Sequence, residues 1–217
     1  NGGTIEHLGG TDIAYAIDNL TSTGAQNAET EINDGTVKST YLAIRQFLNS
    51  TSAQNILTVN GGTIVGTNKS IWMQEANANA NLGTLTVTED AELYGNVYIS
   101  AEDGATKLPV EIAVASAALK NSSEVVLSNA PEYYYLLETN GVWVIDYAYI
   151  DRLDIVDGAL TEFVNQNEKT VGTLTYKRSF SDEMTGTWQT LFVPFEIPVS
   201  ELTAMGYEVA YFNDFRE

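Results

Sequence analysis

The sequence predicts an all-β chain: a parallel β-helix, or solenoid, with about 27 residues per coil, followed by a β-sandwich-like module. Three observations support this fold class: a repeat of constant period, apolar residues that alternate along short β-branched segments, and Gly or Asn between those segments. The chain has 217 residues, of which 44% are hydrophobic, so it carries enough apolar material to fold.

The repeat is clearest between "EINDGTVKSTYLAIRQF" (31–47) and "LTVNGGTIVGTNKSIWMQ" (57–74), whose equivalent positions lie 27 residues apart. "GGTI" at 2–5 and "LTVTEDAELYGNVYIS" at 85–100 are the first and fourth copies, with about five extra residues in the first. A period of this length is typical of stacked units that bury a core only against their neighbours. Alternation at period two favours β-coils over helical repeats.

One apolar column should pass through four coils. Steps of 27 residues connect Ile17, Ile44, Ile71 and Tyr98. In a parallel solenoid such positions stack as ladders at the ordinary strand spacing of about 4.8 Å. We therefore expect these four side chains to share one face.

The corners between strands are expected at Gly35 and Gly62, because a sharp turn there favours a positive φ. Asn60–Gly61 leaves an alternative open, since Asn-Gly is the strongest short hairpin signal and would fit a meander of hairpins. The constant offset at several positions favours the solenoid.

The solenoid is expected to cover residues 1–150. Its coils continue less regularly through 108–129, and "YYYLLETNGVWVIDYAYI" (133–150) predicts two strands around Asn140-Gly141. Such a hairpin would close the end of the solenoid and protect a strand edge from aggregation.

A second unit is expected at 158–217, after a polar and acidic stretch. It contains alternating segments at 173–180 and 187–195 and a helical turn from Ser200 to Met205. We expect an incomplete β-sandwich-like module, because about 100 residues make a complete one.

Composition excludes several classes of site. The net charge is −19, so the overall field repels nucleic acid. The chain has no Cys, and His7 is its single histidine. Disulfides, thiolate sites and His-based zinc clusters are therefore excluded, and no cofactor is expected. The sequence contains no run of about 18 apolar residues, so no membrane-spanning segment is expected.

Two resemblances cover most of the chain. "LTYKRSF", "WQTLFVPFEI" and "EVAYF" resemble a module common at the C-termini of large surface proteins of gut Bacteroidetes. The "LTVNGGTIVGTNKSIWMQ" coils resemble adhesin-like β-helices of bacterial surface proteins and some phage tail proteins. These resemblances imply an exported protein at the cell surface or outside the cell, and carry over no catalytic residues.

The candidate ligand-binding residues follow the apolar column by one position. Asp18, Arg45 and Trp72 are equivalent in successive coils, which predicts an ion pair and an Arg45–Trp72 cation–π contact, each worth about 0.5–1 kcal/mol. Trp72 could stack on a sugar ring while Arg45 and Gln46 offer hydrogen bonds. A purely structural outer ladder is the interpretation we favour.

Acidic residues also suggest a metal site. Asp151, Asp154 and Asp157 recur every third residue and could gather around Ca²⁺, which prefers carboxylates and carbonyls. The pattern is not a DxDxDG loop. We therefore favour the interpretation that this stretch is a solvated acidic linker that binds no metal.

A glycosidase would need two carboxylates facing each other across a cleft. The residues to inspect are Glu89, Asp90 and Glu92, with Glu102 and Asp103 beside them. No position is singled out by sequence, and we expect a protein without enzyme activity.

Aromatic residues gather before the predicted domain boundary. Tyr133, Tyr134 and Tyr135 lie close in sequence to Trp143 and Tyr147. Strand alternation directs about half of them inward, so core packing is expected, with a remainder that could face carbohydrate.

These features predict a secreted or surface-anchored stalk or adhesin that makes weak, multivalent contacts with glycans or host surface proteins. One alternative is a carbohydrate-active enzyme, either a glycosidase or a polysaccharide lyase, on the β-helix. Another is a phage fibre or filament subunit that self-associates through its coil ends.

Overall fold

The computed structural model describes residues 2–9, 14–22, 26–156, 169–177, 198–206 and 208–209, and its fold is all-β apart from one 3₁₀ turn and one short helix. The chain forms two compact units. The first contains residues 1–154 and 161–175, and the second contains residues 155–160 and 176–217.

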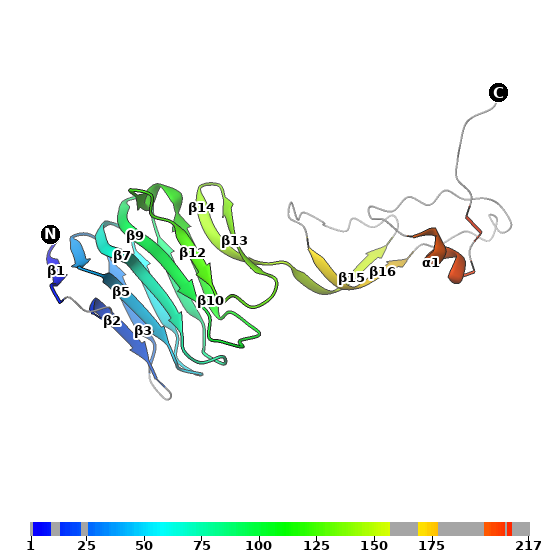
Figure 1. The fold of residues 1–217 in the computed structure, drawn as a ribbon, viewed down its shortest axis with the longest axis horizontal. Helices are drawn as coiled ribbons and strands as arrows, with labels where there is room; N and C mark the ends of the chain where they lie inside the picture. Colours follow the sequence, from blue (N-terminus) through cyan, green and yellow to red (C-terminus); the bar gives the residue numbers. More distant parts are fainter. Residues whose placement is uncertain are drawn as a thin grey trace, which may run out of the picture. The chain divides into compact units, whose positions relative to one another are not determined.

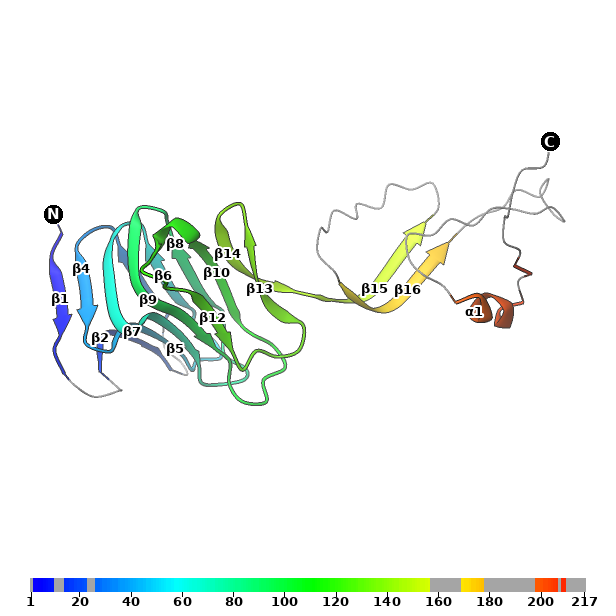
Figure 2. The same cartoon turned by 45° about the horizontal axis from the view of Figure 1, so that its top comes forward.

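The first unit contains a parallel β-solenoid of about four turns, built from two sheets (Figures 1 and 2). Sheet A has eight strands: β1 (Thr4–His7), β2 (Tyr15–Thr21), β4 (Thr36–Ser39), β5 (Leu42–Leu48), β7 (Gly62–Glu75), β9 (Ala91–Ser100), β11 (Leu119–Lys120) and β12 (Val125–Ser128). Sheet B has six strands: β3 (Ala28–Ile32), β6 (Asn55–Val59), β8 (Gly83–Val87), β10 (Val110–Ala115), β13 (Tyr134–Thr139) and β14 (Val142–Tyr147).

The pairing confirms the repeat. Ile32 pairs with Val59 in sheet B, and Ile44 pairs with Ile71 in sheet A, each in parallel and 27 residues apart. The Asn60–Gly61 corner connects β6 in one sheet to β7 in the other, so it is not a hairpin. The chain is therefore a solenoid and not a meander.

The first coil has the insertion that the sequence predicts. Ile5 of β1 pairs with Val37 of β4, an offset of 32 residues, whereas Ile17 of β2 pairs with Ile44 at the usual 27. The five extra residues therefore lie between β1 and β2.

The fourth coil departs from the predicted register. Ile71 pairs with Val97, and Trp72 pairs with Tyr98, because the pairing of β7 with β9 is irregular between Val65 and Ile71. The prediction that Tyr98 joins the apolar column is wrong. Val97 occupies that place and is fully buried, while Tyr98 lies on the other face of the strand.

The core lies between the two sheets. Sheet A contributes Ile44 and Ile71 and sheet B contributes Leu57 and Leu85, all at most 1% exposed. Burial of each such side chain stabilises the fold by roughly 1.5–3 kcal/mol. Because equivalent apolar side chains of neighbouring coils stack on one another, the core is continuous along the solenoid.

The glycine corners adopt the predicted conformation. Gly35 has φ +95° and Gly62 has φ +85°, both in the left-handed region. A Cβ on Gly62 would lie 2.7 Å from the carbonyl oxygen of Gly35. These positions therefore require glycine both for backbone conformation and for the close approach of successive coils.

The predicted hairpin is confirmed. β13 and β14 pair antiparallel, and the turn residues Asn140 and Gly141 have φ of 52° and 75°, as a type I′ turn requires. β14 also pairs antiparallel with β10, so the hairpin extends sheet B beyond the last parallel coil strand.

The remaining elements are few. β15 (Tyr149–Val156) pairs with β16 (Thr170–Lys177), and α1 (Val199–Ala204) ends before Gly206, whose φ is +89°. The predicted strand at 187–195 lies outside the described residues. Among the helices of the described part, none is long and apolar enough to cross a membrane.

Candidate ligand-binding face

The outer face of sheet A brings three predicted site residues together. Asp18 pairs with Arg45, Arg45 with Trp72, and Trp72 with Tyr98 in successive strands. We call these four residues the outer column. The repeat identified the first three, while the register of β9 adds Tyr98.

The predicted ion pair in the outer column is confirmed. Arg45 Nε lies 2.8 Å from Asp18 Oδ1, and a terminal nitrogen lies 2.7 Å from Oδ2, so the guanidinium binds the carboxylate through two hydrogen bonds. This pairing with Asp18, opposed by partial burial, raises the pKa of Arg45. The bidentate geometry connects the first two coils.

The predicted contact of Arg45 with Trp72 is wrong. The guanidinium carbon lies 4.2 Å from the ring centroid of Tyr15 and 4.6 Å from that of Phe47. Two hydrogen bonds to Asp18 in the preceding coil, and a longer one of 3.5 Å to Gln74 Oε1, hold the guanidinium in this position.

Lys69 is the cation that lies over Trp72. Its Nζ is 4.2 Å from the ring centroid of Trp72 and 4.3 Å from that of Tyr98. The indole N–H of Trp72 donates to Ser100 Oγ at 2.9 Å. Lys69 therefore bridges the rings of Trp72 and Tyr98 in successive coils, and the indole nitrogen of Trp72 adds a hydrogen bond to the next coil.

Gln46 does not belong to this face. Its side chain is fully buried, because it follows the outward-facing Arg45 and alternate residues of a strand point to opposite faces. It lies in register between Asn19 and Met73. The prediction that Gln46 offers hydrogen bonds to a ligand there is thus wrong.

Two members of the predicted acidic triplet lie in the described part of the chain. Asp151 and Asp154 lie in β15 three residues apart, which places them on opposite faces of the strand. Asp154 accepts a hydrogen bond from Arg152 Nε at 3.0 Å, and Asp157 lies outside the described residues. The described residues contain no group of three or more acidic, His or Cys side chains arranged for a metal.

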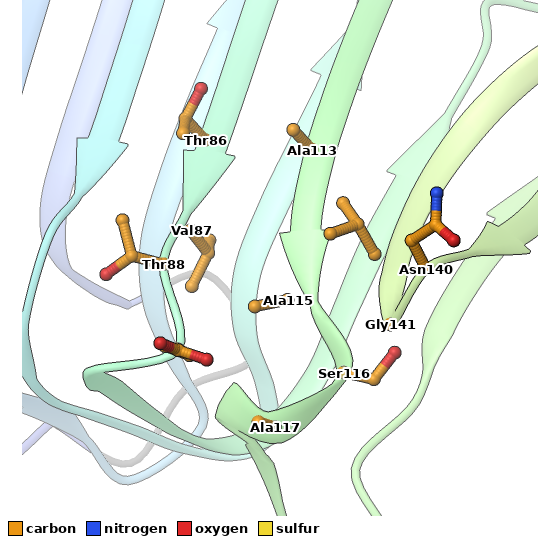
Figure 3. A pocket seen from close by; sticks show the side chains of 11 residues that line it. Thr86, Val87, Thr88, Ala113, Ala115, Ser116, Ala117, Asn140 and Gly141 are labelled. Carbon is orange, nitrogen blue, oxygen red and sulfur yellow. The ribbon is translucent and has the colours of Figure 1, made fainter.

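A groove of about 470 Å³ lies where the ends of β8 and β10 meet the β13–β14 turn (Figure 3). Thr86 and Thr88 lie on one side, with Asn140 and Ser116 on the other. Of the acids singled out in the sequence, Glu89 lines the groove. The sequence did not indicate this groove, because it depends on the antiparallel pairing of β14 with β10.

A tyrosine cluster lies around the hairpin, partly as predicted. The ring centroids of Tyr133 and Tyr149 are 5.0 Å apart, and those of Tyr134 and Tyr147 are 4.6 Å apart. Tyr134 packs against the core, whereas Tyr147 is 42% exposed. Core packing and surface exposure are therefore both present.

Beside this cluster, the hydroxyl of Tyr135 donates to Asp146 Oδ2 at 2.5 Å, which raises the pKa of Tyr135 to about 12. Burial raises the pKa of Asp146, but hydrogen bonds from Lys169 and Tyr135 outweigh it and leave that pKa below its usual value. Lys169 Nζ lies 2.8 Å from Asp146 Oδ2. These contacts attach Lys169 to the hairpin.

Comparisons with protein-family models, with curated proteins and with solved structures find no match to this chain. A functional assignment therefore depends on the geometry of the outer column and its neighbours.

Proposed function

We propose that this chain is a secreted or cell-surface, adhesin-like protein without enzyme activity. Its solenoid acts as a stalk, and the outer face of sheet A makes weak, multivalent contacts with glycans or host surface proteins. The resemblance to bacterial surface β-helices supports this location, and a β-sandwich-like module in the C-terminal unit is part of the same proposal.

The observation that carries the proposal is the arrangement of cations and aromatic rings across neighbouring coils. Arg45 lies over Tyr15 and Phe47, and Lys69 lies over Trp72 and Tyr98. Aromatic rings held on adjacent strands offer apolar surface to a pyranose, while the ammonium of Lys69 donates hydrogen bonds to its oxygens.

The rigidity of the site also favours binding. The rings lie on strands whose inner residues, Ile44 and Ile71, are fully buried, so the backbone beneath the outer column is held by core packing. A preformed site loses less conformational entropy on binding. Several copies on one surface would then add avidity to a weak single contact.

A glycan array tests the proposal when wild-type chain and a Trp72→Ala variant are displayed as multimers. We expect Trp72→Ala to weaken glycan binding at least about fivefold, since it removes the largest ring of the face. Tyr94→Ala is the matched control, because Tyr94 lies on sheet A but in register with Val65, outside the outer column. Glycan binding that both variants leave unchanged would contradict the proposal.

Self-assembly is a second candidate. In the described part of the chain, β3 and β13 end sheet B, and each pairs with one strand only. Such edges present backbone groups that can pair with another chain. Oligomers that grow with protein concentration and are unaffected by Trp72→Ala would favour a filament over a glycan-binding face.

A further inference from the structure

Charged residues are distributed unequally between the two sheets. The strands of sheet B carry five acids and no Lys or Arg: Glu29, Glu31, Glu111, Glu138 and Asp146. The strands of sheet A carry four acids, Glu6, Asp18, Glu75 and Glu92, and also four bases, Lys38, Arg45, Lys69 and Lys120. Although the whole chain has a net charge of −19, its cations in the solenoid strands are therefore concentrated on one sheet.

Three of these four bases have partners within the chain. Lys38 forms an ion pair with Glu6 at 2.7 Å, and Arg45 forms one with Asp18 at 2.7 Å. Lys120 Nζ donates to the carbonyl oxygen of Ala117 at 2.8 Å. Their charges or donors are thus already engaged.

Lys69 differs from the other three. Within the described part of the chain, its ammonium has no carboxylate or hydrogen-bond acceptor as a partner and contacts the ring faces of Trp72 and Tyr98. Lys69 is half-buried, so its ammonium has lost part of its hydration, and this burial lowers the pKa of Lys69. Its N–H donors are available to an acceptor that comes from outside the chain.

We propose that Lys69 binds the carboxylate or sulfate group of an acidic saccharide whose sugar ring lies along the outer column. This inference rests on the proposed glycan-binding face and names the class of glycan. The aromatic rings hold the ammonium at the surface of sheet A, and a partly dehydrated cation interacts more strongly with an anion than a fully hydrated one. Trp72 and Tyr98 then contact the apolar face of the same sugar.

The overall negative charge limits the size of the ligand and does not prevent its binding. At physiological ionic strength the Debye length is about 8 Å, so exposed acids further away are largely screened. A short oligosaccharide meets only the charges of sheet A, whereas a long polyanion would also meet the acids elsewhere on the chain. A short acidic oligosaccharide is therefore the matching ligand.

The test is a calorimetric titration of the full chain with trigalacturonate, its methyl ester and a sulfated dextran trisaccharide. The ester keeps the sugar rings and removes the charge. We expect the ester to bind about tenfold more weakly than the acid, in line with the loss of a charge-assisted hydrogen bond. Binding of both trigalacturonate and the sulfated trisaccharide would identify a general anion site. Binding of only one of these two would identify its carboxylate or sulfate as the preferred group.

Three variants separate a local effect of Lys69 from net charge. Lys69→Gln should weaken binding of the acid about tenfold, Lys69→Arg should retain it, and Lys107→Gln, at an exposed position with the same charge change, should bind as the wild type does. If Lys69→Gln does not fold, Lys69→Arg and the salt dependence of the wild type decide. Binding of the acid should then weaken as NaCl increases.

The outcomes distinguish the two proposals. Equal binding of acid and ester, abolished by Trp72→Ala, would overturn the role of Lys69 and leave the glycan-binding face in place. Equal losses in Lys69→Gln and Lys107→Gln would also overturn that role. Binding of none of the three saccharides, or binding insensitive to both Trp72→Ala and Lys69→Gln, would overturn both proposals.

Discussion

Glu75 is an ionisable residue in the solenoid core, and its protonation makes the stability of the fold depend on pH. Its side chain is 2% exposed at the end of β7, in register with Leu48. Oε2 accepts the backbone N–H of Glu102 at 3.1 Å, and Oε1 has no hydrogen-bond partner in the described part of the chain. Burial raises the pKa of Glu75, although the hydrogen bond from Glu102 opposes that shift. The folded state therefore favours the protonated acid.

We predict that Glu75→Gln stabilises the chain at high pH. A raised pKa means that the folded state holds the proton more tightly than the unfolded state, whose Glu pKa is about 4.3. The free energy of unfolding of the wild type therefore falls as the pH rises from that value through the folded pKa. Gln has no such dependence, so the variant should match the wild type near pH 4 and exceed it by about 1 kcal/mol at pH 8.

Urea unfolding at pH 4 and pH 8 measures this difference. Glu111→Gln is the matched control, because Glu111 is exposed on β10 and its replacement removes the same charge. If Glu75→Gln and the control changed stability equally at both pH values, burial of the Glu75 carboxylate would not be the cause.

At the scale of elements, the sequence predicted the coils better than it predicted the candidate site. Stacked coils bury equivalent apolar residues, so the offset from Ile44 to Ile71 is visible in the sequence. The register of β9 is not visible, because it changes through an irregularity in pairing and not through a residue type. Tyr98 was therefore placed on the wrong face. Lys69 was missed because its contacts with Trp72 and Tyr98 depend on that register.

The case of Gln46 is different. Strand alternation alone would have placed it inside, next to the outward-facing Arg45. The prediction instead gave it a role as a hydrogen-bond donor to a ligand, and an unpaired carboxamide is seldom buried. Neither nitrogen nor oxygen of this carboxamide has a hydrogen-bond partner among the described residues. Here the packing of the two sheets overrides the preference of the side chain.

The glycine corners allow a prediction about how coils approach each other. Gly62→Ala should lower the free energy of unfolding by more than about 2 kcal/mol, since it combines a positive φ with a Cβ 2.7 Å from the Gly35 oxygen. Gly104→Ala is the control: its φ is +78°, but no atom lies within 4 Å of its added Cβ. It should lose only about 1 kcal/mol.

Chemical denaturation of both variants gives the comparison. Equal losses would show that backbone conformation alone, and not the contact between coils, makes glycine necessary at Gly62. A larger loss in Gly62→Ala shows that successive coils are held at a spacing that has no room for a side chain.

At the scale of the whole molecule, a stack of coils needs closed ends. Each coil is stabilised by its neighbours, so a terminal coil lacks half of its contacts. At the C-terminal end of sheet B, β14 pairs with β10 through Val114 and Ala115. Leu136, Trp143 and Ile145 of the hairpin pack against the core. The hairpin thus pairs with part of the β10 edge and packs against the apolar core at the end of the last coil.

Two truncations test this role of the hairpin. A chain of residues 1–177 keeps it, and a chain of residues 1–129 lacks it and exposes the edge of β10. We expect the shorter chain to form oligomers, because an uncovered strand edge next to apolar core residues pairs with other chains. The longer chain should keep the association state of the full-length protein.

Light scattering after size-exclusion chromatography, at matched concentrations, measures the mass of each truncated chain. Oligomers confined to residues 1–129 would show that the hairpin blocks growth from this end, which disfavours a filament that grows by pairing at β10. The same association state and equal melting temperatures for both chains would mean that the last parallel coil is stable with an open end. In that case β13 and β14 would not be needed to close the solenoid, and an open β10 edge would not by itself drive self-assembly through this coil end.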